Sequence, residues 1–331
     1  MKDMTLIVDA GGTKTDWILA GGGGISRCRT AGINPAVMPK EEILAVVLGA
    51  AESISGNRKE DRTGSETCGI AVGDRDNPDA GRTVIQDTGE CTGGTDYGNG
   101  YGDGRPCIVG RIRDIRYYGA GVVGTAGLVE LDVILKNVFH GAEVSYGSDL
   151  LLAAEAGLDG EAGIVGILGT GSNSGVYDGR KIVANIRPGG FVLGDEGSGN
   201  AMGRILLGDY IKDRLPAGLK EKFEAEYRLT YAEIVENVYR RANPAGYLAS
   251  FAPFIFACRG DEYADALIDR CLRSFIERSL LPYGMSGSKV AITGSVGMEC
   301  KDELRMLGQE YDLDFFRFVK SPADELIGKI L

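Results

Sequence analysis

The stretch "LIVDAGGTKTDW", residues 6–17, decides how the first part of the chain folds. Its apolar run ends in the carboxylate of Asp9 and continues into two glycines, two hydroxyl residues and a lysine. This pattern predicts a buried strand, a glycine turn and a second strand. Two interpretations of the turn stay open at this point. It is either an ordinary hairpin turn, or a cradle whose backbone amides approach phosphate because glycine carries no Cβ; the residues concerned are Gly11, Gly12, Thr13 and Lys14.

The composition is that of an ordinary globular protein. The chain has 331 residues, enough for two domains, with 44% hydrophobic and 25% charged residues. Its formal net charge of −11 argues against nucleic acid or an anionic membrane as the main partner. The seven cysteines show no CxxC spacing, and the first residues lack the apolar length of a signal peptide. We therefore expect a cytoplasmic protein that binds neither nucleic acid nor membrane.

Two later stretches repeat the pattern of the opening one. "GIVGILGTGSNSGVYDG" (163–179) again predicts a strand, a glycine turn and a second strand. "AITGSVG" (291–297) is an apolar strand that runs into small residues on which a flat ligand could lie. Two hairpins of matched pattern, one near the start of each half, predict a duplicated fold that faces a common cleft. The small residues are Gly169, Thr170, Gly171 and Ser172 in the first stretch, and Gly294, Ser295 and Gly297 in the second.

A third stretch, "GGFVLGDEGSGNAMGRILLGDYI" (189–211), predicts a strand, an acidic glycine-rich corner and a helix. Ser198 is the expected N-cap of that helix, and Asp195 and Glu196 precede its positive end.

Taken in order, the segments "DAGGTKTDW", "GILGTGSNS", "PGGFVLGDEGSG" and "ITGSVG" resemble the N-acetylglucosamine kinase branch of the actin–hexokinase–Hsp70 ATPase superfamily, a group often pooled with the BadF/BadG/BcrA/BcrD ATPases. The resemblance covers roughly residues 1–55 and 113–331. It implies an α/β fold of two RNase H-like domains, each a mixed sheet flanked by helices, which close on ATP and a sugar. By this resemblance the turn at 11–14 is a phosphate cradle.

The resemblance also implies the nucleotide site. The two glycine turns would hold the phosphates from either side, and the "ITGSVG" residues would contact the nucleotide. Asp9 would hold Mg²⁺, through water. The expected cofactors are thus ATP and Mg²⁺, the expected partner is a small-molecule amino sugar, and we expect a homodimer.

Phosphoryl transfer to a sugar also needs a carboxylate that takes the hydroxyl proton. Asp149, in "AEVSYGSDLLLAAEAGL", follows an alternating strand and starts a helical pattern. By resemblance it is the catalytic aspartate. A helix N-cap formed by Ser148 and Asp149 is the structural alternative, and both roles can hold together.

The remaining sugar contacts come from the resemblance alone. Asn34 of "TAGINP" would reach the sugar, although a turn before Pro35 explains the same residues. The other expected contacts are Ser148, Asn173, Gly190 and Asp195. Ser148 departs from the asparagine that the family often has beside its catalytic acid, so the hydroxyl contacts are open at that position.

Residues 56–112 are rich in Gly and Asp and match no part of the family pattern. They are an insertion, a lid, or hairpins that extend the sheet. The strand required before the catalytic segment is either 68–74 or 115–121, and the second agrees better with bacterial relatives. The expected domains are 1–158 and 159–320, with a C-terminal helix at 321–331 that packs back on the first.

Two rival functions remain. An activator ATPase for a dehydratase or reductase would need cysteines that hold an iron–sulfur cluster, and the seven cysteines form no suitable cluster in the sequence. A sugar sensor without turnover would keep the cleft but need not keep Asp9, Asp149 and both turns. An amino-sugar kinase, most simply an N-acetylglucosamine kinase, is the leading hypothesis.

Overall fold

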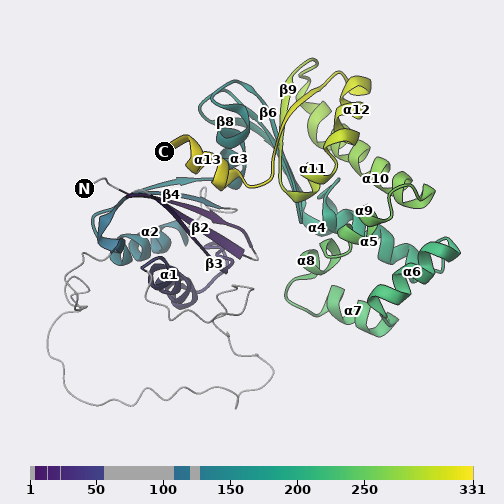
Figure 1. Cartoon of the computed structure of the whole chain (residues 1–331), viewed down its shortest axis with the longest axis horizontal. Coiled ribbons are helices and arrows are strands. Elements are labelled where there is room, and N and C mark those ends of the chain that lie inside the picture. Colours follow the sequence, from purple (N-terminus) through teal and green to yellow (C-terminus); the bar gives the residue numbers. More distant parts are fainter. Residues whose placement is uncertain (1–3, 13, 23, 56–107, 120–126, 331) are drawn as a thin grey trace, which may run out of the picture. The chain divides into compact units, whose positions relative to one another are not determined.

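The computed structural model describes residues 4–12, 14–22, 24–55, 108–119 and 127–330 (Figure 1). These residues divide into two compact units, residues 1–146 and 147–331. Each unit contains a five-stranded mixed sheet flanked by helices, so the predicted fold class is confirmed.

The first unit is built on the sheet β3-β2-β1-β4-β5. Its strands run antiparallel from β1 to β2 and from β2 to β3, whereas β1 and β4 are parallel. Helices α1 and α2 cover one face, where Leu6, Val8 and Trp17 are fully buried (Figure 1). The elements are β1 (Met4–Ala10), β2 (Lys14–Gly21), β3 (Gly24–Ala31), α1 (Lys40–Ile54), the 3₁₀ turn η1 (Ile108–Arg111), β4 (Ile112–Gly119), α2 (Gly127–Val138) and β5 (Glu143–Gly147).

The second unit repeats this topology in the sheet β10-β9-β6-β7-β8. Its strands are β6 (Gly163–Leu168), β7 (Ser172–Tyr177), β8 (Ile182–Ile186), β9 (Lys289–Thr293) and β10 (Asp314–Val319). Strands β6, β7 and β8 form the antiparallel meander, and β6 pairs in parallel with β9. In chain order both sheets have the spatial order third, second, first, fourth, fifth. The duplication predicted from the matched hairpins is therefore present in the strand order.

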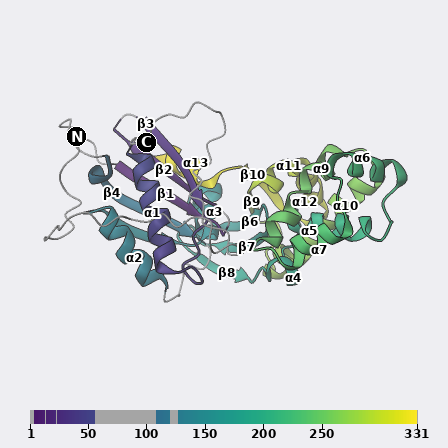
Figure 2. The ribbon, with the colours of Figure 1, turned by 90° about the horizontal axis from the view of Figure 1, so that it is seen from below.

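Helices cover both faces of the second sheet. Helix α3 (Asp149–Leu158) packs Leu150, Ala153 and Leu158 on one face, and α13 (Pro322–Ile330) packs against α3. The other face carries a larger core. Figure 2 shows helices α5, α6, α7, α9 and α10 beyond strands β6, β7 and β9, on the side away from α3. The remaining elements are α4 (Gly190–Leu193), α5 (Gly199–Tyr210), α6 (Ala217–Tyr227), α7 (Tyr231–Tyr239), α8 (Pro244–Ala249), α9 (Ala252–Ala257), α10 (Glu262–Phe275), the π turn η2 (Ile276–Leu280), the 3₁₀ turn η3 (Leu281–Tyr283), α11 (Ser295–Glu299) and α12 (Lys301–Tyr311).

One of the two candidate strands upstream of Asp149 is a strand of the first sheet. Strand β4 includes most of the 115–121 candidate, whereas 68–74 and nearly all of 56–112 lie outside the described residues. The structure groups α3 with the second unit, whereas the expected boundary after residue 158 places it in the first. Helix α13 contacts α3, the last element of that expected first domain.

One predicted strand is wrong. Residues 190–193 form the short helix α4, because the Gly194 amide donates to the Gly190 carbonyl oxygen and closes a helical turn. Gly189 and Gly190 enter this turn with φ of +76° and +70°, a left-handed conformation that glycine adopts readily. The apolar run is consequently not a sheet strand, and Leu193 is 80% exposed.

Candidate functional site

The turn between β1 and β2 is closed by a hydrogen bond from the Gly11 amide to the Lys14 carbonyl oxygen, at 2.8 Å. Gly12 is exposed, and a Cβ built on it would meet no atom within 4 Å. The exposed Lys14 ammonium lies 3.8 Å from the Asp16 carboxylate. Thr13, the fourth residue of the predicted cradle, lies outside the described residues. The turn thus presents an open glycine backbone with a cation beside it, which suits an anion.

A glycine that the sequence reading did not single out supports this turn. A Cβ on Gly32 would lie 2.5 Å from the Gly11 carbonyl oxygen and 2.5 Å from the Gly12 carbonyl carbon. No side chain fits at that distance, so the backbone after β3 can touch the turn only through a glycine. The signal was present as the glycine of "TAGINP", two residues before Asn34.

Asp9 is the next-to-last residue of β1 and is partly exposed. In the sheet it is paired with Asp16 on β2 and Tyr118 on β4. Burial, and after it the charge of Asp9, raises the pKa of the neighbouring Tyr117 hydroxyl, so this phenol stays neutral near the carboxylate. Among the described residues no three His, Cys, Asp or Glu side chains form a metal-binding group. A single carboxylate fits Mg²⁺, which keeps several waters and takes substrate phosphates as its other ligands.

Asn34 follows β3 in the same unit. Its side-chain oxygen accepts from the Ala36 amide at 3.1 Å, and its carbonyl oxygen accepts from the Met38 amide at 2.9 Å. A turn is therefore present, but it begins at Asn34 and runs through Pro35 to Met38, whereas the sequence predicted one before Pro35. The turn uses only oxygen atoms of Asn34, so its role in binding sugar stays a prediction.

The turn between β6 and β7 is held from behind by helix α5. The Gly199 amide donates to the Gly169 carbonyl oxygen at 2.9 Å, and the Asn200 amide donates to the Thr170 carbonyl oxygen at 3.0 Å. Ser198 caps the helix as predicted, because its hydroxyl accepts from the Ala201 amide. The first amides of α5 are thus committed to the turn and to the cap.

Asp195 links the same turn to the same helix. Its carboxylate accepts from the Ser172 amide at 3.2 Å and from the Asn200 side-chain amide at 2.8 Å. It is 7% exposed, and its φ of +56° is uncommon for a residue with a side chain. A Cβ on Gly171 would lie 3.0 Å from this carboxylate, so glycine allows the close approach. Asp195 therefore positions the second turn, and the predicted contact with sugar stays a prediction.

Asp149 is the first residue of α3, and only Ser148 separates it from the end of β5. The N-cap is Ser148, whose hydroxyl accepts from the Leu151 amide at 3.1 Å. Asp149 instead accepts from the Leu150 amide at 2.8 Å through one oxygen. Burial raises the pKa of its carboxyl, while this backbone hydrogen bond opposes the rise. Because Ser148 caps the helix, Asp149 is not needed as the cap, and its role as general base stays a prediction.

Asn173 on β7 extends the second turn. Its side-chain oxygen accepts from the Ser174 amide and from the Asn185 side chain, both at 2.9 Å. This arrangement fixes the orientation of the amide, so that its NH₂ group is the part left to donate to a ligand. The substrate contact itself stays a prediction.

The "AITGSVG" residues form the end of β9 and the start of α11. Gly294, with φ of +103°, approaches the Leu168 carbonyl oxygen so closely that a Cβ would lie 2.4 Å from it. Gly297 is buried against Ile292, which gives it a packing role that needs no ligand. Ser295 is exposed. Contact of these three residues with a nucleotide stays a prediction.

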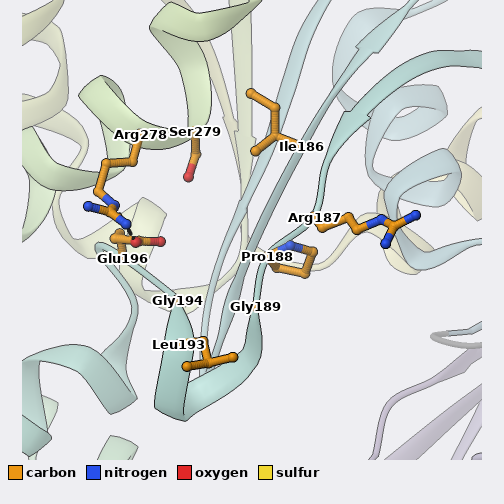
Figure 3. A pocket seen from close by; sticks show the side chains of 9 residues that line it. All are labelled: Ile186, Arg187, Pro188, Gly189, Leu193, Gly194, Glu196, Arg278 and Ser279. Atoms are coloured by element: carbon orange, nitrogen blue, oxygen red, sulfur yellow. Dashed lines mark hydrogen bonds and ion pairs between the residues drawn. The ribbon is translucent and has the colours of Figure 1, made fainter.

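A hollow of about 310 Å³ opens beside the acidic glycine-rich corner (Figure 3). One side comes from the end of β8, one from α4, and one from the π turn η2. Two of its lining residues form an ion pair, in which the Arg278 Nε atom lies 2.7 Å from a Glu196 oxygen. The lining residues are Ile186, Arg187, Pro188, Gly189, Leu193, Gly194, Glu196, Arg278 and Ser279. Sequence reasoning did not find Arg278 and Ser279, because they lie far along the chain from the corner.

No helix among the described residues has the length and apolar character needed to cross a membrane.

Neither a family model nor a curated protein sequence matches the chain. Among solved structures, a putative N-acetylglucosamine kinase from Porphyromonas gingivalis is 30% identical, with 98% of this chain and 97% of that chain covered and a TM-score of 0.78. A putative N-acetylglucosamine kinase from Chromobacterium violaceum is 16% identical, with 99% of each chain covered and a TM-score of 0.63. A ROK family glucokinase from Streptomyces griseus, in complex with glucose and AMPPNP, is 16% identical, with coverage of 98% and 97% and a TM-score of 0.51. The last two likenesses show a shared fold.

Proposed function

We propose that this chain, which belongs to the N-acetylglucosamine kinase-like family of the actin–hexokinase–Hsp70 superfamily, transfers the γ-phosphoryl group of ATP to a hydroxyl of an amino sugar. N-acetylglucosamine is the leading substrate. The observation that carries the proposal is Asp149, a half-buried carboxylate whose pKa is raised by burial and whose capping role is taken by Ser148.

We assign the base, the phosphate contacts and the magnesium ligand to different residues. The sugar hydroxyl oxygen attacks the γ-phosphorus, its proton passes to Asp149, and the bond from the γ-phosphorus to the bridging oxygen breaks to leave ADP. The turns at 11–14 and 169–172 hold the phosphates by backbone amides other than those of Gly11, Gly169 and Ser172, which donate within the protein. A magnesium ion held through water at Asp9 would offset the negative charge of the phosphates.

Support for the nucleotide comes from the first turn, which has an open glycine backbone beside Lys14. The Streptomyces griseus fold neighbour was solved with glucose and the ATP analogue AMPPNP, which agrees with ATP as the phosphoryl donor. Support for the sugar comes from the hollow beside Gly189 and Glu196, whose volume of about 310 Å³ is at the lower end of the range of small-molecule sites.

A panel of sugars in a coupled ADP-release assay tests this function. The panel holds N-acetylglucosamine, glucosamine, N-acetylmannosamine, N-acetylmuramic acid and glucose. We expect an N-acetylhexosamine to give the highest kcat/KM. If glucose, or a non-sugar acid assayed beside the panel, is preferred by tenfold or more, the substrate assignment fails.

The rival functions make different predictions in parallel assays. An activator ATPase would contain iron and hydrolyse ATP without sugar. A sensor would bind sugar without turnover. Among the described cysteines, Cys271 and Cys300 are buried in the core of the second unit, which agrees with packing rather than with a cluster shared between subunits.

A further inference from the structure

Helix α10 does not end as an ordinary helix. It continues into the π turn η2 (Ile276–Leu280) and then the 3₁₀ turn η3 (Leu281–Tyr283). Single π turns inside helices are rare and occur frequently at functional sites. Here the π turn supplies Arg278 and Ser279 to the hollow beside the acidic glycine-rich corner (Figure 3).

A chain of hydrogen bonds joins this turn to the meander of the second sheet. The Ile186 amide donates to the Tyr283 hydroxyl at 2.9 Å, and the Ser174 hydroxyl donates to the Ser279 carbonyl oxygen at 2.6 Å. The Tyr283 and Ser174 hydroxyls lie 3.0 Å apart. Since the Ser174 proton is already given to Ser279, Tyr283 donates to Ser174. Each hydroxyl thus accepts one hydrogen bond and donates one, so the chain has a single direction.

The hydrogen-bond chain reaches the hollow through Ile186 and the predicted sugar contact Asn173 through Ser174. Ile186 is the last residue of β8 and lines the hollow. Ser174 is 1% exposed and directly follows Asn173, and the Ser174 amide donates to the Asn173 side-chain oxygen. Asn185 ties the two strands together, because its side chain donates to the oxygen of Asn173 and to the Ser174 carbonyl oxygen.

The opposite side of the hollow is tied to the same turn. Arg278 donates to Glu196, which directly follows Asp195. The π turn therefore holds the end of β8 through Tyr283 and the acidic corner through Arg278. These two anchor points belong to different sides of the hollow (Figure 3).

We propose that Tyr283 is a positioning residue for the sugar, which fixes the end of β8 against the π turn and so sets the width of the hollow. This inference rests on the proposed function, because it takes the hollow to receive part of the sugar. The hydrogen bonds of Tyr283 go to Ile186 and Ser174, and neither residue is the proposed base or part of the phosphate turns. Loss of the Tyr283 hydroxyl lowers the affinity for sugar and leaves the rate of phosphoryl transfer unchanged.

Tyr283→Phe keeps the ring and removes only the hydroxyl in the middle of the chain. The matched control is Tyr311→Phe, whose hydroxyl donates to Glu277 at 2.6 Å in the same π turn but on an exposed side. We expect Tyr283→Phe to raise KM for the sugar about tenfold, since the Ile186 amide loses its acceptor and the Ser174 hydroxyl loses its donor. We expect kcat and KM for ATP to stay within about threefold, and the control to match wild type. Ser174→Ala, which breaks the next link, should give the same split.

A second measurement needs no substrate. Amide hydrogen exchange at Ile186 should be about tenfold faster in Tyr283→Phe than in wild type or Tyr311→Phe, because its acceptor is gone. Unchanged exchange overturns the hydrogen-bond chain. Faster exchange with unchanged sugar KM, or with an equal rise in KM for ATP, overturns the positioning role. If the wild-type protein neither binds nor phosphorylates any sugar of the panel, the proposed function fails and the hollow is not a sugar site, whatever the exchange rates show.

Discussion

The β1–β2 turn and the β6–β7 turn occupy the same place in two sheets of the same strand order, but they are supported differently. The first rests on backbone contact with Gly32 and leaves Gly12 open. The second is tied by the amides of α5 and by the buried carboxylate of Asp195. One duplicated fold thus carries a turn fixed by close packing and a turn fixed by a polar network. The first therefore depends on the absence of a side chain at Gly32, and the second depends on the carboxylate of Asp195.

The largest expected effect lies in the second unit, at Asp149. Asp149→Asn keeps the shape and can still accept from the Leu150 amide, but it cannot take a proton. A positioned base contributes about 10²–10⁴-fold, so we expect kcat to fall by at least a hundredfold. Steady-state kinetics together with thermal melting measure this. Because Ser148 is the cap, melting should be near normal; near wild-type turnover would move the base elsewhere, with Asp195 as the next candidate.

The next largest effect is on stability, where removal of a carboxylate should cost more near the second turn than near the first. Asp195→Ala leaves the Ser172 amide and the Asn200 side chain without their acceptor, which costs about 2–4 kcal/mol. Asp16→Ala is the counterpart near the first turn, where the carboxylate pairs with the half-exposed Arg29, and it should cost about 0–1 kcal/mol. Urea or thermal unfolding of both variants checks the difference. Equal losses would show that the second turn does not depend on the network.

Added volume should affect the first turn at Gly32 and not at Gly12. Gly32→Ala overlaps the backbone of Gly11 and Gly12, and overpacking of this kind costs about 1–3 kcal/mol. Gly12→Ala meets no atom and should leave melting unchanged. If Gly12 lies against phosphate, the added methyl group nevertheless raises KM for ATP. A normal KM for ATP in Gly12→Ala would contradict the phosphate cradle at this residue.

The smallest expected effect is on stability against pH. Burial raises the pKa of Asp149 in the folded protein, so the folded state takes up this proton more readily than the unfolded state. The wild type therefore gains stability from this group as the pH falls through the raised pKa, and lacks that gain at neutral pH. Asp149→Asn should melt slightly higher than wild type at pH 7 and lose this advantage in acid. Melting curves from pH 7 to pH 4 test it, and a variant several degrees less stable at pH 7 would contradict the cost of burying the charge.

Local sequence determined the elements on which the site is built. The two hairpins follow from apolar strands around glycine turns, and the α5 cap follows from Ser198, because these signals act within a few residues of one another. The strand and helix around Asp149 could be predicted for the same reason. The one failure, at 190–193, is an apolar run too short to show a period, where two glycines allowed a helical turn.

Tertiary structure decided how these elements are held. Gly32 matters only because β3 returns beside the first turn, and Asp195 only because α5 begins behind the second. The link between Tyr283 and Ile186 spans 97 positions of the chain, and that between Ser174 and Ser279 spans 105. A hydroxyl carries no sequence signal for a partner at that distance, because the strand order and a π turn bring the two together. The sequence by itself predicted which residues would carry chemistry, and the fold decided which residues hold the turns and strands beside them.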